Sequence, residues 1–154
     1  MVTALQHDSR YSKLLVNSFY HHAFIDRLIF PPNEIIILQG DKGLIKQALR
    51  IFIDNSIKYT PAGGKIRINS CHAGNRAILT VEDSGIGISK EDIPHIFDRF
   101  YKCDKSRTRE SSSTGLGLSI AKWIVEKHEG SIKAESEINK GTKITISLPV
   151  HPQN

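Results

Sequence analysis

The chain has 154 residues, 39% hydrophobic and 24% charged, a balance typical of one globular domain. No apolar run reaches the roughly 18 residues of a membrane-spanning helix, and the N-terminal stretch lacks the segment order of a signal peptide. The net charge of +5 is compatible with nucleotide phosphates, nucleic acid or an anionic membrane surface as partner. Cys71 and Cys103 match no zinc or redox spacing, so we expect reduced thiols in a reducing compartment.

The N-terminal part of the chain shows only short patterns. Residues 9–24 have a weak helical spacing of apolar side chains. Apolar runs at 28–30 and 35–38 flank a Pro-Pro-Asn turn and predict two short strands.

A stronger helix signal follows. Asp41 is placed as an N-cap, and apolar residues recur at helical spacing over 44–57. We expect this helix to end near Tyr59, because Pro61 disfavours helical geometry at the residue before it.

The middle of the chain predicts two strands, a loop and a short helix. Residues 65–69 and 77–81 have the apolar alternation of strands. A glycine loop occupies 83–87, and Ser89 could cap a short helix that extends to Phe97.

The last third begins with a polar stretch at 102–113 that has no periodicity and predicts a mobile loop. The helix after it should extend to about Glu129, with Gly130 in the C-cap position. Strands at 132–134 and 144–148 should form a hairpin. Because helices and strands do not alternate regularly, the order favours an α+β fold.

The glycine-rich stretches match neither common nucleotide motif. After Gly87 and Gly117, the third glycine of a dinucleotide fingerprint is replaced by Lys90 and Ile120. The Gly-Lys pair at 64–65 is followed by isoleucine rather than the serine or threonine of a P-loop.

Three polar residues of the predicted central helix share one face. Asn55, Lys58 and Tyr59 stand at positions i, i+3 and i+4. An amide oxygen can bind Mg²⁺, and a lysine can meet phosphate as a point charge. By itself, Asn55 favours an ordinary exposed helix position.

The glycine loops add two further candidates. Asp83 ends a predicted strand just before two glycines, where a carboxylate can accept a hydrogen bond from a base amine and a flat ring can approach the backbone. Gly115 and Gly117 leave the first amides of a helix uncovered, which favours an anion. Each residue alone also suits an ordinary turn. Their order and spacing together favour a nucleotide.

Five ordered segments within residues 41–149 resemble the motifs of one family, the catalytic ATP-binding domain of bacterial sensor histidine kinases. They correspond to its N box, first glycine box, F box, second glycine box and closing strand. The segments are QALRIFIDNSIKYTPAGG, VEDSGIGI, IFDRFYK, TGLGLSIAKWIVEKHEG and GTKITISLP.

The resemblance implies a two-layer α/β sandwich of the Bergerat type, an α+β fold with helices on one face of a mixed sheet. It implies a catalytic domain at residues 25–150, preceded by a linker and first helix at 1–24 and followed by a tail at 151–154. The resemblance implies that this chain shares its fold with DNA gyrase and related ATPases.

The resemblance also implies roles for residues. Asn55 would hold Mg²⁺, and Lys58 and Tyr59 would reach the phosphates of ATP, so that Asn55 and Lys58 are the expected catalytic pair. Asp83 would accept the adenine amine, and residues 102–113 would form a lid. The other implied ATP-binding residues are Gly85, Gly87 and Ile88 at the base, and Lys102, Thr114, Gly115, Leu116, Gly117 and Leu118 at the phosphates.

Three departures from the family pattern stand out. Ile51 replaces an asparagine or, in hydrolysing relatives, a glutamate, so efficient ATP hydrolysis is not expected. Serines at 112–113 replace two glycines and would stiffen the lid hinge. No phosphoacceptor motif is found, since His7-Asp8 has no proline after it.

The implied function is transfer of the γ-phosphate of Mg-ATP to a histidine on a separate dimerisation domain of the same kinase. A response regulator would be the next partner, nucleic acid would not be one, and the fragment would be monomeric. The domain would be cytoplasmic, with the full-length protein anchored in the bacterial inner membrane. The alternatives are a nucleotide-gated binding module, an ATP-hydrolysing relative and a serine kinase that targets anti-sigma antagonists.

Overall fold

The computed structural model describes residues 2–5, 28–29, 36–103 and 114–150. The expected helix within 9–24 and most of the expected lid lie outside the described residues. The elements are β1 (Val2–Leu5), β2 (Leu28–Ile29), β3 (Ile36–Gln39), α2 (Lys42–Tyr59), β4 (Ile66–Ala73), β5 (Arg76–Asp83), the 3₁₀ turn η2 (Ile93–His95), α3 (Gly117–Lys127), β6 (Ser131–Glu137) and β7 (Gly141–Pro149).

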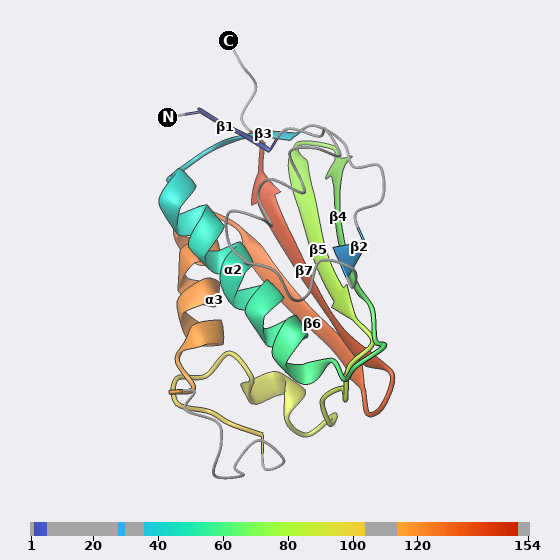
Figure 1. Ribbon diagram of the computed structural model, residues 1–154. Coiled ribbons are helices and arrows are strands. Elements are labelled where there is room, and N and C mark those ends of the chain that lie inside the picture. The colour runs from blue at the N-terminus through green and yellow to red at the C-terminus, as the bar shows by residue number, and fades with distance from the viewer. Residues whose placement is uncertain (1, 6–27, 30–35, 104–113, 151–154) are drawn as a thin grey trace.

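Two helices cover one face of a mixed sheet (Figure 1). The sheet has five strands in the order β2-β4-β5-β7-β6; β2 is parallel to β4, and the other neighbours are antiparallel. β1 and β3 form a separate antiparallel pair. The expected α+β sandwich with helices on one face of a mixed sheet is therefore confirmed, whereas the two strands that flank Pro31 join different sheets.

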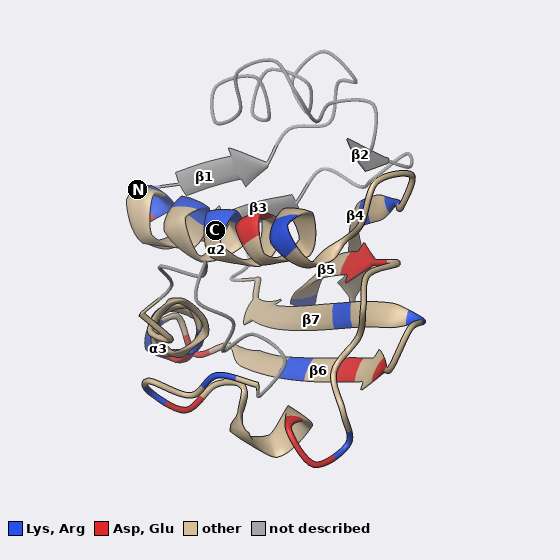
Figure 2. Ribbon diagram, turned by 60° about the horizontal axis from the view of Figure 1, so that its bottom comes forward, with Lys and Arg blue, Asp and Glu red and all other residues tan. Residues whose placement is uncertain are grey.

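Helix α2 forms because local signals define both of its ends. The Asp41 carboxylate accepts a hydrogen bond from the Leu44 amide at 3.0 Å, as a helix N-cap does. At the other end Thr60 is extended, which the following Pro61 favours. Basic side chains lie along α2 (Figure 2), and Lys42, Lys46 and Arg50 follow one another at one-turn spacing outside its buried face. The inner face buries Ile45, Ala48, Phe52 and Ser56.

Helix α3 ends earlier than the sequence predicted, at Lys127 rather than Glu129. Glu129, not Gly130, has the left-handed backbone, with φ of 55°. The Gly130 amide still closes the helix end by donating to the Val125 carbonyl at 2.9 Å. Glycine is needed at this position for another reason: a Cβ there would lie 2.8 Å from the Ser147 carbonyl oxygen.

The expected helix from Ser89 to Phe97 is wrong, since only the 3₁₀ turn η2 forms. Ser89 does bond to Asp92 through its hydroxyl, but Pro94 follows within the same turn. Proline restricts the preceding residue and has no amide hydrogen to extend a helix, so regular structure stops after one turn.

The core lies between the two helices and the sheet. Phe52 of α2 and Ile124 of α3 are each 1% exposed and meet apolar side chains of β4, β5 and β7. The antiparallel hairpin β6–β7, predicted from the sequence, is confirmed. No helix in the described ranges is long and apolar enough to cross a membrane.

Strand register brings distant residues to one end of the sheet. Asp83, the last residue of β5, pairs with Ile66 at the start of β4 and with Thr142 near the start of β7. Asp83 therefore lies at the same edge as the C-terminal end of α2, whose Tyr59 carbonyl accepts a bond from the Ile86 amide at 3.1 Å.

Candidate functional site

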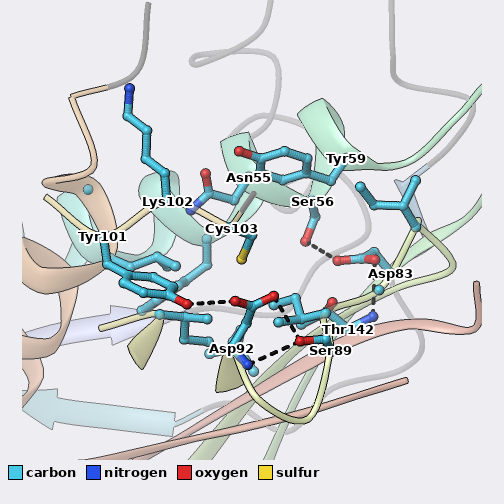
Figure 3. Close-up of a pocket in the computed structure, with 18 of the residues that line it drawn as sticks. Asn55, Ser56, Tyr59, Asp83, Ser89, Asp92, Tyr101, Lys102, Cys103 and Thr142 are labelled. Atoms are coloured by element: carbon cyan, nitrogen blue, oxygen red, sulfur yellow. Dashed lines mark hydrogen bonds between the residues drawn. The ribbon is translucent and has the colours of Figure 1, made fainter. Parts of the chain in front are cut away.

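A cavity of about 680 Å³ opens between the C-terminal half of α2, the segment after β5 and the start of α3 (Figure 3). Its polar lining residues are Asn55, Ser56, Tyr59, Asp83, Ser89, Asp92, Tyr101, Lys102, Cys103, Thr114 and Thr142.

Asp83 is a buried carboxylate at one wall of the cavity, 9% exposed. Its Oδ2 accepts a hydrogen bond from the Ser56 hydroxyl at 3.0 Å. Its Oδ1 accepts from the amides of Gly85 at 2.9 Å and Thr142 at 3.2 Å. Burial raises the pKa of Asp83, and these three donors act against that rise by stabilising the ionised form.

The turn after Asp83 depends on glycine. A Cβ at Gly85 would lie 2.5 Å from the Tyr59 carbonyl oxygen, so a larger residue would push the loop away from α2. Gly87 has a φ of 70°, and a Cβ there would meet the Glu137 carbonyl oxygen. These two glycines hold the loop against both α2 and the β6–β7 hairpin, and so place Ile86, which lies between them, at the cavity.

The opposite wall is held by a hydrogen-bonded group around Asp92. The Tyr101 hydroxyl donates to Asp92 Oδ1 at 2.6 Å, and the Ser89 hydroxyl donates to Oδ2 at 2.8 Å. These bonds hold the pKa of Asp92 below its ordinary value. They also tie Tyr101, and with it Lys102 and Cys103, to the wall beside η2 (Figure 3).

The start of α3 is open to the cavity. Gly115 has a φ of 72°, and its carbonyl accepts a bond from the Phe100 amide at 2.9 Å. Leu116 is the N-cap and supplies no capping side-chain bond, and Gly117 adds no side chain to the first turn. The first amides of the helix and its dipole therefore favour an anion at this end of the cavity.

Most of the predicted ligand-binding residues line the cavity, and three do not. Lys58 is exposed, with its Nζ 5.1 Å from the ring centroid of Tyr59, and it is not among the residues that line the cavity. Gly85 and Leu116 support the walls through their backbones. The predicted residues that line the cavity are Asn55, Tyr59, Asp83, Gly87, Ile88, Lys102, Thr114, Gly115, Gly117 and Leu118.

Several lining residues were not predicted from the sequence. Ser56 could have been found, since it follows Phe52 by four residues on the buried face of α2. Thr142 and the group formed by Ser89, Asp92 and Tyr101 carried no such signal, because only strand register and loop packing bring them to the cavity.

The donor set fits a metal ion bound together with phosphate. No group of three or more His, Cys, Asp or Glu side chains that could hold a metal occurs within the described ranges. Asn55 offers an amide oxygen at the cavity. Mg²⁺ keeps several waters and usually binds through one or two protein oxygens plus substrate phosphates, so one amide ligand beside a phosphate site suits it.

Helices on one face of a mixed sheet, with a cavity at the ends of α2 and α3, form the architecture that solved histidine kinase catalytic domains share with this chain. The described fold superposes on the catalytic domain of the histidine kinase ThkA with a TM-score of 0.76 at 27% identity, covering 99% of both chains. Against the mycobacterial sensor histidine kinase MprB the TM-score is 0.75 at 25% identity, covering 94% of this chain and 93% of that one.

The family described as histidine kinase-, DNA gyrase B- and HSP90-like ATPase matches residues 40–152, and the chain belongs to it. It is 40% identical over 147 residues to the sensor histidine kinase WalK of Bacillus subtilis, covering 91% of this chain and 24% of WalK. It is 50% identical over 101 residues to the histidine-protein kinase ArlS of Staphylococcus aureus, covering 66% of this chain and 22% of ArlS. The chain thus spans about a quarter of the length of these relatives.

Proposed function

We propose that the chain binds Mg-ATP in the cavity and donates the γ-phosphate to a histidine on a separate dimerisation domain. The observation that carries the proposal is Asp83: a buried carboxylate, held by three donors, faces a cavity whose other end is an uncapped helix N-terminus. The carboxylate suits a base amine and the helix terminus suits phosphate.

Each wall has a part in this function. Asp83 accepts the adenine amine, while Gly87 and Ile88 shape the base pocket beside it. The first amides of α3, with Thr114 and Leu118 alongside, receive the phosphates, and Lys102 adds positive charge there. Asn55 holds Mg²⁺, which would neutralise phosphate charge. Transfer breaks the bond between the γ-phosphorus and the bridging oxygen of ADP and forms one to a histidine nitrogen, so this chain's task is positioning.

The phosphate role expected of Lys58 stays a prediction. Its ammonium lies beside the Tyr59 ring on the exposed side of α2, outside the lining of the cavity. The proposed phosphate contacts therefore rest on α3 and Lys102.

Titration of the isolated chain with ATP, ADP and GTP, with and without Mg²⁺, tests the proposal. We expect ATP and ADP to bind and GTP to bind much more weakly, because guanine presents a carbonyl where adenine presents an amine. Mg²⁺ should strengthen ATP binding. Equal affinity for ATP and GTP, measured by calorimetry, would contradict the assignment of Asp83.

The chemical labelling of Cys103 gives an independent measurement. Cys103 lines the cavity, whereas Cys71 lies on β4 away from it, and both are partly exposed. Bound ATP should slow alkylation of Cys103 by iodoacetamide and leave Cys71 unchanged, as read by mass spectrometry of the two peptides. Equal protection of both thiols would indicate a global change rather than occupation of the cavity.

The wider context is part of the same proposal. The full-length protein would carry a dimerisation domain with the phosphoacceptor histidine, pass phosphate to a response regulator and be anchored in the bacterial inner membrane. Residues 25–150 would form its cytoplasmic catalytic domain, monomeric on its own, between a linker with a first helix at 1–24 and a tail at 151–154.

A nucleotide-gated binding module without transferase activity is the second candidate. Ile51 favours it, since this apolar side chain packs against the core next to Gly117, whereas the family pattern implied by the resemblance has asparagine or glutamate there. Fusing the chain to the dimerisation domain of a related sensor kinase distinguishes the two. Tight ATP binding without phosphohistidine would support the second candidate, and phosphohistidine would support the first.

A further inference from the structure

Ser56 is a buried polar residue to which the proposed function assigns no part. It follows Asn55 on α2, is 5% exposed and lines the cavity. Its hydroxyl donates to Asp83 Oδ2 at 3.0 Å, and the two side chains face each other across the cavity wall (Figure 3).

The hydrogen bonds to Asp83 are unevenly distributed. Oδ1 accepts two, from the amides of Gly85 and Thr142, whereas Oδ2 accepts one, from Ser56. Each oxygen of an ionised carboxylate accepts about two hydrogen bonds. The acceptor position left for a ligand is therefore on Oδ2, the oxygen that Ser56 already holds.

The hydrogen bond to Asp83 determines the direction in which the Ser56 hydroxyl proton points. A serine hydroxyl has one proton and two lone pairs. With its proton directed to Asp83, Ser56 can only accept from a ligand. Side by side, the Ser56 Oγ and Asp83 Oδ2 atoms form an acceptor-only pair, which suits an exocyclic amine and repels a carbonyl in the same place.

We propose that Ser56 is a positioning and specificity-determining residue of the nucleotide site: its hydroxyl orients Asp83 Oδ2 toward the base and excludes bases that present a carbonyl there. This inference rests on the proposed function, because it assumes that the cavity binds a purine nucleotide.

Two substitutions of Ser56 test the positioning role. Ser56→Ala should weaken ATP binding about tenfold through the loss of one charge-assisted hydrogen bond, and Ser56→Thr, which keeps a hydroxyl, should restore it. In an Asp83→Asn background, Ser56→Ala should cause no comparable further loss. A full tenfold loss in both backgrounds would show that Ser56 acts independently of Asp83 and would overturn the proposal.

The pH profile separates positioning from simple space filling. ATP binding needs ionised Asp83, so the affinity for ATP should fall as the pH is lowered and Asp83 becomes protonated. Ser56→Ala removes a donor that lowers the pKa of Asp83, so the acid limb should move to higher pH. An acid limb at the same pH in the folded Ser56→Ala variant would overturn the proposal.

The specificity role can also be tested on the unmodified chain, with nucleotides that differ at the position of the adenine amine. Purine riboside triphosphate lacks the amine, and inosine triphosphate replaces it with a carbonyl. The expected order of affinity is ATP, then purine riboside triphosphate, then inosine triphosphate. Equal binding of the last two would show that the Ser56 proton turns to the ligand and would overturn the specificity role. Absence of any ATP binding would overturn the proposed function itself, whereas an altered order with ATP bound would overturn only the role of Ser56.

Discussion

Replacing Asp83 by asparagine is expected to weaken ATP binding by about 10- to 150-fold. The variant loses a charge-assisted hydrogen bond to the adenine amine worth about 1.5–3 kcal/mol. Asparagine can present its amide N–H to the guanine carbonyl, so the preference for ATP over GTP should shrink or reverse. Calorimetric titration of both nucleotides against the variant measures this change.

The matched control is Glu82→Gln. Glu82 is the neighbouring residue of β5, exposed and outside the cavity lining, and the substitution removes the same charge. It should leave ATP affinity within about twofold, as isolated surface charges contribute little. A similar loss in both variants would show that net charge, rather than the contact made by Asp83, governs affinity.

The Asp83→Asn chain should remain folded. Burial raises the pKa of Asp83 above the ordinary value of 3.8, so the fold favours the protonated form. The stability that this group contributes is present at low pH and is lost as the pH rises through the folded-state pKa. Neutral asparagine avoids that loss, and at pH 7 its melting temperature should equal or exceed that of the unmodified chain. A clear decrease in melting temperature would contradict the conclusion that burial disfavours the ionised form of Asp83.

Replacing Gly141 by alanine is expected to cause a large loss of stability. Gly141 has a φ of 108°, and a Cβ there would overlap the Asp83 carbonyl oxygen. Strained backbone and overpacking together should cost about 2–4 kcal/mol. Because the clash is with Asp83, ATP affinity of the fraction that stays folded should fall as well. Chemical denaturation and ATP titration measure the two effects.

Gly74→Ala provides the control for backbone strain alone. Gly74 also has a positive φ, of 62°, but a Cβ there would have no heavy atom within 4 Å. It lies in the β4–β5 turn, and its substitution should cost about 1–2 kcal/mol and leave ATP binding unchanged. Equal destabilisation at Gly74 and Gly141 would argue against the close approach of β7 to Asp83.

Elements with local signals were predicted well. Helix α2 begins after Asp41 and ends before Pro61, as expected, because an N-cap and a proline act on their immediate neighbours. The β6–β7 hairpin follows from alternation and a short turn at 138–140 in the same way. These features need no knowledge of the rest of the fold.

Predictions that depended on packing were less accurate. A helix from Ser89 was expected, but one 3₁₀ turn forms, and α3 ends two residues early with Glu129 in the left-handed position. Lys58 was assigned to the ligand face from its i+3 spacing; its side chain is exposed and lies beside the Tyr59 ring, outside the cavity lining, and its phosphate role stays a prediction. Spacing shows which residues can share a face, but packing decides which face meets the cavity.

By itself, the sequence determined the family and the α+β class and predicted the chemistry of the candidate site, because ordered motifs carry Asn55, Asp83 and the glycines at the start of α3. Only the tertiary structure decided how the Asp83 carboxylate is held. Its donors Ser56 and Thr142 lie 27 and 59 residues away along the chain, and helix packing and strand register bring them together. A buried carboxylate depends on such long-range donors, since no neighbour in sequence can satisfy both of its oxygens.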